Sequence, residues 1–156
     1  CVTANSAWIV ECDGRIPQVA ILDVTTQGTT NTAATVTTFT SSSGCALTAT
    51  LDNASIAATG TTIITPRRAG NYLCTVNYSP VTTLTAAKYI SAFIDVGGAI
   101  DTLRANLGVG GGAVQAIVVS GIVKIAAGTA IKGQFRTEDA NMGINVNSAF
   151  SVAEIL

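Results

Sequence analysis

The chain has 156 residues, of which 48% are apolar and 11% are charged, and its formal net charge is -1. This length fits a single domain with a hydrophobic core. The low charge leaves no basic stripe for nucleic acid, and the hydrophobicity excludes a disordered chain. No apolar run reaches the roughly 18 residues of a membrane span, so we expect no membrane insertion. The chain begins at Cys1 without methionine, and we expect a processed product or part of a longer polypeptide.

The first 17 residues form a predicted connector or extra strand ahead of the main domain at 18–156. They contain the only tryptophan, Trp8, in an apolar patch. Trp8 either packs at the periphery of the core or inserts into a neighbouring subunit. Cys1, Trp8 and Cys12 are therefore the candidate residues for linking one subunit to the next.

The main domain contains ten short runs of apolar or alternating residues, separated by glycine, proline, serine and polar loops. Its many β-branched side chains favour strands. The pattern predicts an all-β sandwich or barrel. We interpret 41–44 as a hairpin loop and Gly97-Gly98 as a turn. The predicted strands span 18–25, 34–40, 46–51, 61–66, 71–78, 88–96, 99–107, 114–125, 130–137 and 148–155.

Alternation assigns a buried face to two of the middle strands. In 71–78 that face carries Tyr72, Cys74, Val76 and Tyr78, and in 88–96 it carries Ile90, Ala92, Ile94 and Val96. Phe93 is an exception, because it lies on the opposite, polar face of its strand.

The stretch 114–137 is the most hydrophobic part of the pattern. One face of its first run carries Ile117, Val119, Val123 and Ile125, and the other face carries Val114, Ala116, Val118 and Ile122. Such a strand must be covered on both sides. In the second run, Ile131, Gly133 and Phe135 alternate with Lys132, Gln134 and Arg136, which predicts one covered face. Residues 126–129, with Gly128 at a positive φ, predict an antiparallel hairpin between the two runs.

The sequence lacks the usual chemistry of an enzyme. There is no histidine, which removes the commonest general base and any Ser-His-Asp or Cys-His arrangement. No phosphate-binding loop, nucleophile elbow or zinc motif is present. We predict no catalytic residue, cofactor or metal site. Arg67-Arg68 is interpreted as a solvated or carboxylate-paired turn, because adjacent side chains in a turn diverge.

Four cysteines leave the disulfide pattern open. Cys1 with Cys12, or Cys45 with Cys74, are natural pairs if a disulfide exists, although four cysteines allow three pairings. Cys74 could equally be a small buried hydrophobe. An N-terminal cysteine could also bridge to a neighbouring chain.

From about Leu47 onward the order of features resembles the C1q/TNF-like jelly roll. The strand-turn-strand signature of that family is matched by the segment 60–72, with Pro66, Gly70 and Tyr72 in the motif positions. Similar segments follow at 90–98, at 118–130 and in the terminal strand 148–156. The resemblance implies an antiparallel jelly-roll β-sandwich of about ten strands that forms homotrimers around a three-fold axis. The low aromatic content resembles microbial or phage members on fibres, spores and capsids.

Two functions follow from this resemblance. The first is the homotrimeric head or tip of an extracellular, cell-surface or virion fibre, which binds a cell-surface glycan or protein through loops 81–87, 105–112 and 138–147. The second is a structural subunit of a capsid decoration or self-assembling filament, linked into a polymer by the N-terminal segment. The candidate residues for the trimer interface are Tyr89, Phe93, Val118 and Phe150.

Overall fold

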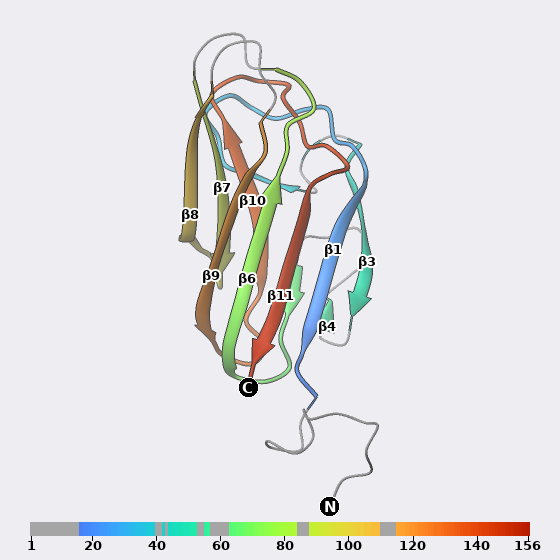
Figure 1. Ribbon diagram of the computed structural model, residues 1–156, viewed down its shortest axis with the longest axis vertical. Helices are drawn as coiled ribbons and strands as arrows, with labels where there is room; N and C mark the ends of the chain where they lie inside the picture. Colours follow the sequence, from blue (N-terminus) through green and yellow to red (C-terminus); the bar gives the residue numbers. More distant parts are fainter. Residues whose placement is uncertain are drawn as a thin grey trace, which may run out of the picture.

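The computed structural model describes residues 16–39, 42, 44–52, 55–56, 63–83, 88–109 and 115–156, and these ranges contain eleven strands and no helix. Figure 1 shows the strands running along the long axis of the molecule. The strands are β1 (Val19–Thr26), β2 (Thr37–Thr38), β3 (Ala46–Asp52), β4 (Ser55–Ile56), β5 (Ile63–Thr65), β6 (Gly70–Tyr78), β7 (Lys88–Val96), β8 (Ala99–Val109), β9 (Ile117–Ile125), β10 (Ile131–Thr137) and β11 (Ala149–Ile155).

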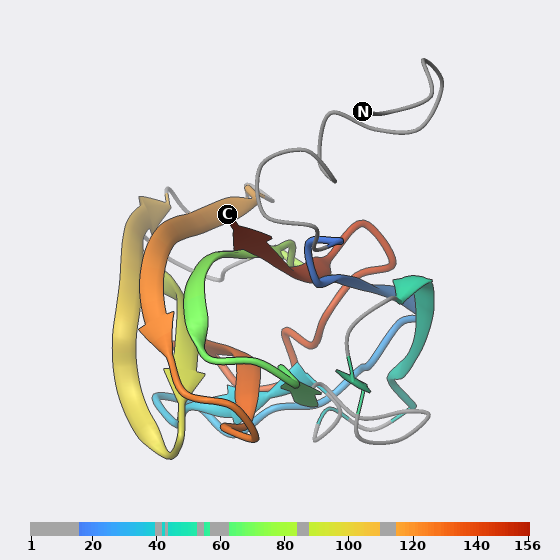
Figure 2. The same ribbon diagram turned by 90° about the horizontal axis from the view of Figure 1, so that it is seen from below.

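The strands form two antiparallel sheets. The first sheet has the order β3-β1-β11-β6-β9, and the second has the order β4-β5-β10-β7-β8, with β2 paired to β10. Figure 2 shows the two sheets as layers that face each other and come together where β8 lies beside β9. The prediction of an all-β antiparallel jelly-roll sandwich is therefore confirmed.

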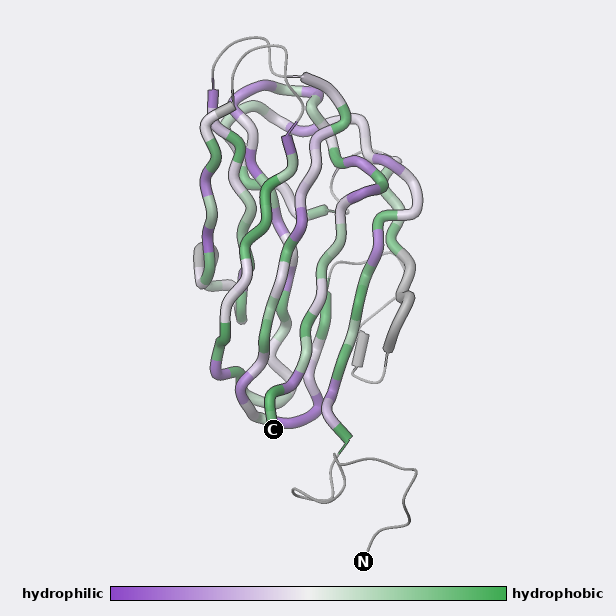
Figure 3. Tube along the Cα trace, in the orientation of Figure 1, coloured by the Kyte–Doolittle hydropathy of each residue, from purple (hydrophilic) through white to green (hydrophobic). Residues whose placement is uncertain are grey.

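The hydrophobic core fills the space between the two sheets. Its centre is an aromatic cluster in which Phe135 stacks on Tyr78 with ring centroids 4.5 Å apart and Phe39 packs 6.1 Å from Phe135. All three side chains have 0% exposure. Because inward side chains alternate with outward ones, the hydropathy of the trace also alternates along the strands (Figure 3). The inward faces predicted for 71–78 and for Ile90, Ala92 and Ile94 are confirmed.

Gly133 on β10 lies at a close contact between the two sheets. A Cβ atom at this position would stand 3.2 Å from Cβ and Cγ of Phe150 and 3.3 Å from Cγ2 of Val76, both on the opposite sheet. Glycine therefore leaves the room that the Phe150 side chain fills.

Two predicted hairpins are wrong, although the strands themselves exist. β9 pairs with β6 in the first sheet, whereas β10 pairs with β5, β7 and β2 in the second, so residues 126–130 cross between the sheets. Gly128 does adopt a positive φ of 76°, and its N-H donates to the Pro66 carbonyl at 2.8 Å. The predicted strands 34–40 and 46–51 likewise belong to different sheets, because β2 pairs with β10 and β3 pairs with β1. The predicted hairpin at Gly97-Gly98 is confirmed.

Candidate functional site

The outer face of the first sheet has short, uncharged side chains in its middle, with Lys124 on β9 and Asp23 on β1 in the rows to either side. The strand registers align Ile122, Leu73, Ala153 and Val19 in one row across four strands. The neighbouring row contains Ser120, Thr75, Ser151 and Ile21, and Val118 follows on β9 in the next row. We call these nine residues the assembly face.

Three branched apolar side chains remain open to solvent on the assembly face. The exposed fractions are 57% for Val118, 65% for Ile122 and 41% for Leu73. The hydroxyls of Thr75 and Ser120, which lie between them, are 2.7 Å apart and hydrogen-bond each other. The middle of this face therefore offers apolar area without a charge that would have to be desolvated.

The outer face of the second sheet carries several cationic side chains. Lys132 and Arg136 project from β10, and Arg104 projects from β8. Charged side chains keep a surface in water, whereas an uncharged apolar face favours contact with another protein surface. The two faces of the sandwich are thus suited to different surroundings.

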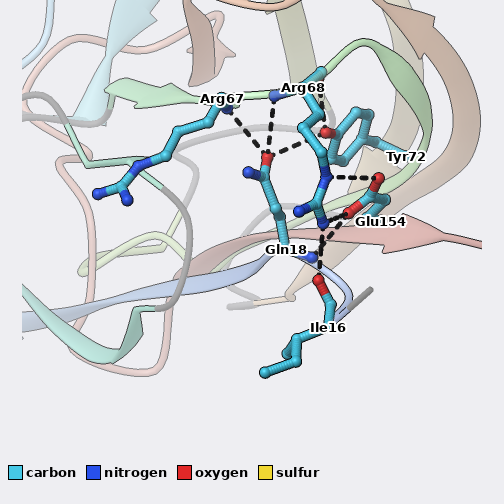
Figure 4. Close-up of polar contacts among 6 residues, drawn as sticks. All are labelled: Ile16, Gln18, Arg67, Arg68, Tyr72 and Glu154. Atoms are coloured by element: carbon cyan, nitrogen blue, oxygen red, sulfur yellow. Dashed lines mark hydrogen bonds and ion pairs between the residues drawn. The ribbon is translucent and has the colours of Figure 1, made fainter. Parts of the chain in front are cut away.

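A buried polar cluster lies at the end of the sandwich where β1 starts, and it links β1 to β11 and to the turn before β6 (Figure 4). The Oε1 atom of Gln18 accepts from the N-H of Arg67 at 2.9 Å and from the Tyr72 hydroxyl at 3.1 Å. Oε2 of Glu154 accepts from the N-H of Gln18 at 2.9 Å and from Nη2 of Arg68 at 2.5 Å. The prediction that this arginine turn is carboxylate-paired is confirmed for Arg68, so its guanidinium serves the fold.

The polar loop 138–147 is held at the other end of the sandwich. The amide group of Asn31 donates to Oγ1 of Thr137 at 2.8 Å and to the Asp139 carbonyl at 3.0 Å. Its oxygen accepts from the N-H groups of Met142 at 2.8 Å and Gly143 at 3.1 Å. One buried side chain thereby satisfies hydrogen-bonding groups at the start of the loop and at residues 142–143. These bonds hold the loop in a defined shape.

The structure does not gather the four predicted interface residues on one surface. Val118 is exposed on the assembly face, and Tyr89 is exposed on the opposite sheet. The prediction is wrong for Phe150, which has 0% exposure because it fills the space between the sheets over Gly133. It is also wrong for Phe93, whose 2% exposure leaves almost no surface for a neighbouring subunit. Sequence reasoning missed Ile122 and Leu73 as interface candidates, although the alternation had already placed Ile122 beside Val118.

Cys45 and Cys74 are free thiols, so the predicted disulfide between them is wrong. Cys74 has 0% exposure on the inner face of β6, and its role is that of a small core residue. Burial raises the pKa of the Cys74 thiol to about 12 and that of Cys45 to about 11. Cys1, Trp8 and Cys12 lie outside the described residues.

Two antiparallel sheets with these strand orders define a TNF-like jelly roll. Among solved structures, the chain is similar to murine APRIL, a TNF-family domain. The structure of murine APRIL at pH 8.5 has 12% sequence identity and a TM-score of 0.62, and the one at pH 5.0 has 14% and 0.63. Each alignment covers 90% of this chain and 100% of the other. No protein-family model and no curated protein sequence matches the chain. The likeness establishes the fold.

Among the described residues, no helix has the length and apolar character needed to cross a membrane. In the same part of the chain, no group of three or more potential metal-ligating side chains comes together.

Proposed function

We propose that the protein is a non-enzymatic, homotrimeric head domain that binds a receptor at the end of an extracellular or virion fibre. The observation that carries the assembly part is the assembly face itself, with Val118, Ile122 and Leu73 exposed. Ile122 and Leu73 are direct neighbours across β9 and β6, and a contiguous exposed apolar patch favours contact with another protein surface. We propose that two further copies of the chain cover these side chains in a trimer.

The exposed apolar area is large enough to favour association. Full burial of a valine, leucine or isoleucine side chain is worth about 1.5–3 kcal/mol. With the exposed fractions of Val118, Ile122 and Leu73, completing their burial contributes about 2–5 kcal/mol per subunit. In a closed trimer this contribution recurs three times, because every subunit presents the same face.

The fibre context and the receptor-binding role rest on the resemblance of the sequence to C1q/TNF-like domains of microbial and phage surfaces. A trimeric head presents three copies of each loop to one target surface. Simultaneous contacts of this kind raise the apparent affinity by about 10²–10⁴-fold over a single contact. The loop 138–147, held by Asn31, is the described loop that best suits such a contact.

The test compares two exposed valines. Val118→Asp places a carboxylate in the middle of the assembly face, whereas Val146→Asp makes the same change in a turn outside it, at a residue with 48% exposure. Native mass measurements should show trimers for the parent chain and for Val146→Asp, and folded monomers for Val118→Asp, because an unpaired buried carboxylate costs several kcal/mol. Circular dichroism checks that both variants keep their β structure. A trimer of unchanged stability in Val118→Asp would contradict the proposal.

A further inference from the structure

A hollow of about 290 Å³ opens on the outer face of the second sheet. It lies over three adjacent strands, β10, β7 and β8, and is separate from the assembly face, which belongs to the other sheet. Its volume is near the lower limit of small-ligand pockets, about 300 Å³, so it suits one small ligand unit.

The floor of the hollow consists of Ser91 and Phe93 on the central strand, β7. These residues have 7% and 2% exposure although they point away from the core of the sandwich. Longer side chains from both neighbouring strands enclose them. Arg104 and Asn106 lie opposite them on β8, and Arg136 lies opposite Ser91 on β10.

The two arginines place positive charge on opposite sides of the floor. The amide of Asn106 is oriented with its oxygen toward Arg104, because the reverse orientation sets donors against donors. In this orientation the oxygen accepts from Nε of Arg104 at 3.2 Å and from Nη2 at 3.3 Å, and the amide nitrogen donates to Oγ of Ser91 at 2.7 Å. Arg104 is thereby held beside the hollow.

Arg136 provides the observation that points to a ligand. Its Nε is buried, and within the part of the chain that the structure describes it has no hydrogen-bond partner. Buried donors in native proteins are nearly always satisfied by a protein group, an ordered water or an ion, so an orphaned guanidinium donor on a residue that lines the hollow favours an acceptor bound there. A guanidinium pairs best with a planar carboxylate, which can accept two parallel hydrogen bonds.

The rim of the hollow limits which anion fits. Glu138 lines it, and its Oε2 accepts from the N-H of Tyr89 at 2.8 Å. Two guanidiniums and one carboxylate leave one net positive charge around the hollow. A ligand with a single negative charge neutralises this balance, whereas a doubly charged phosphate would leave one net negative charge in the hollow.

Tyr89 adds an apolar platform at the rim. Its ring lies along Gly108 of the neighbouring strand, where a Cβ atom would stand 3.4 Å from Cε1 of the ring. The side chain nevertheless remains 60% exposed. An exposed aromatic ring beside hydrogen-bonding groups suits the apolar face of a sugar ring.

We infer that this hollow binds a carboxylate-bearing sugar residue of a glycan, with the carboxylate at Arg136 and Arg104 and the sugar ring against Tyr89. Asn106, Ser91 and Glu138 are then the hydrogen-bonding partners of the sugar hydroxyls. The inference rests on the proposed receptor-binding function, since it names the chemical class of the receptor. The hollow itself lies within one subunit and does not require the trimer.

The test measures binding of methyl glucuronide to the full chain by ligand-observed NMR and calorimetry. Methyl glucoside, which lacks the carboxylate, and inorganic phosphate are the comparison probes. We expect methyl glucuronide to bind at least about tenfold more tightly than either, because a charge-assisted pair contributes about this factor. Equal binding of the glucoside, or stronger binding of phosphate, would overturn the inference.

Matched variants locate the site. Arg136→Gln should weaken glucuronide binding by about tenfold or more. Lys132→Gln removes the same charge from the same strand outside the hollow, and its affinity should stay within about twofold of the parent, as for an exposed charge. An equal loss of glucuronide affinity in both variants would overturn the placement of the site in the hollow. The native mass of the same samples separates the two proposals. A trimer that does not bind glucuronide overturns this inference alone. A monomer that binds glucuronide overturns only the proposed trimer.

Discussion

Replacing Phe135 with alanine should lower the free energy of unfolding by about 3–5 kcal/mol per subunit. The side chain has 0% exposure, stacks on Tyr78 at 4.5 Å and packs 6.1 Å from Phe39. Burial of a phenylalanine side chain accounts for about 1.5–3 kcal/mol of this loss. The aromatic contacts add about 0.5–1.5 kcal/mol, and the cavity left between two paired sheets supplies the rest.

Urea unfolding followed by circular dichroism measures this loss. Parent and variant are compared at one protein concentration, because the stability of an oligomer depends on concentration. Tyr89→Ala is the control, since it removes an aromatic ring with 60% exposure and should cost no more than about 1 kcal/mol. A loss below about 1 kcal/mol for Phe135→Ala would refute the inward facing of β10 on which the core depends.

Two further predictions concern the packing at Gly133 and the buried thiols. Gly133→Ala should cost about 1–3 kcal/mol in the same urea assay, because the added methyl meets Phe150 at 3.2 Å, and an unchanged midpoint would show that the sheets can separate freely. Stability should also fall as the pH rises from 9 toward 11–12. The folded pKa values of Cys45 and Cys74 are raised from 9.0 to about 11 and about 12, so the unfolded chain releases these protons first. Urea midpoints at pH 8 and pH 10 measure this fall, and Cys74→Ala should reduce it; a slope unchanged in Cys74→Ala would contradict the assignment.

The facing of individual strands could be predicted from the sequence because side chains alternate strictly along a strand. Tyr72, Cys74, Val76 and Tyr78 all point into the core as this rule requires. Val118 and Ile122 point outward for the same reason, although they are apolar. Local patterning therefore predicted which side chains face the core and placed Val118 and Ile122 outward, although it did not single out Ile122 or Leu73 as interface candidates.

The pairing of strands could not be read in the same way. Residues 126–129 have the length and the glycine of a hairpin, yet β9 and β10 enter different sheets. A turn determines that the chain reverses, but pairing depends on edges supplied by distant strands. β6 supplies the edge for β9, and β7 supplies one for β10. The same limitation explains the wrong hairpin across 41–44.

The sequence indicated less of the hollow on the second sheet than of the assembly face. Phe93 on a polar face was the one local sign of the hollow, because an aromatic residue there needs cover from its neighbours. Its cross-strand neighbours are Arg104 on β8 and Gln134 on β10, which only the sheet brings together. The cysteines could not be paired from the sequence either. Cys45 and Cys74 lie in one sandwich but remain free thiols.

The native mass of the parent chain, measured at micromolar concentration with and without reductant, tests the central claim most directly. The proposed association through Val118, Ile122 and Leu73 is non-covalent and predicts three chain masses under both conditions. A mass of one chain would contradict the trimer. A ladder of multimers that collapses in reductant would contradict it too, and would favour subunits linked through Cys1 or Cys12.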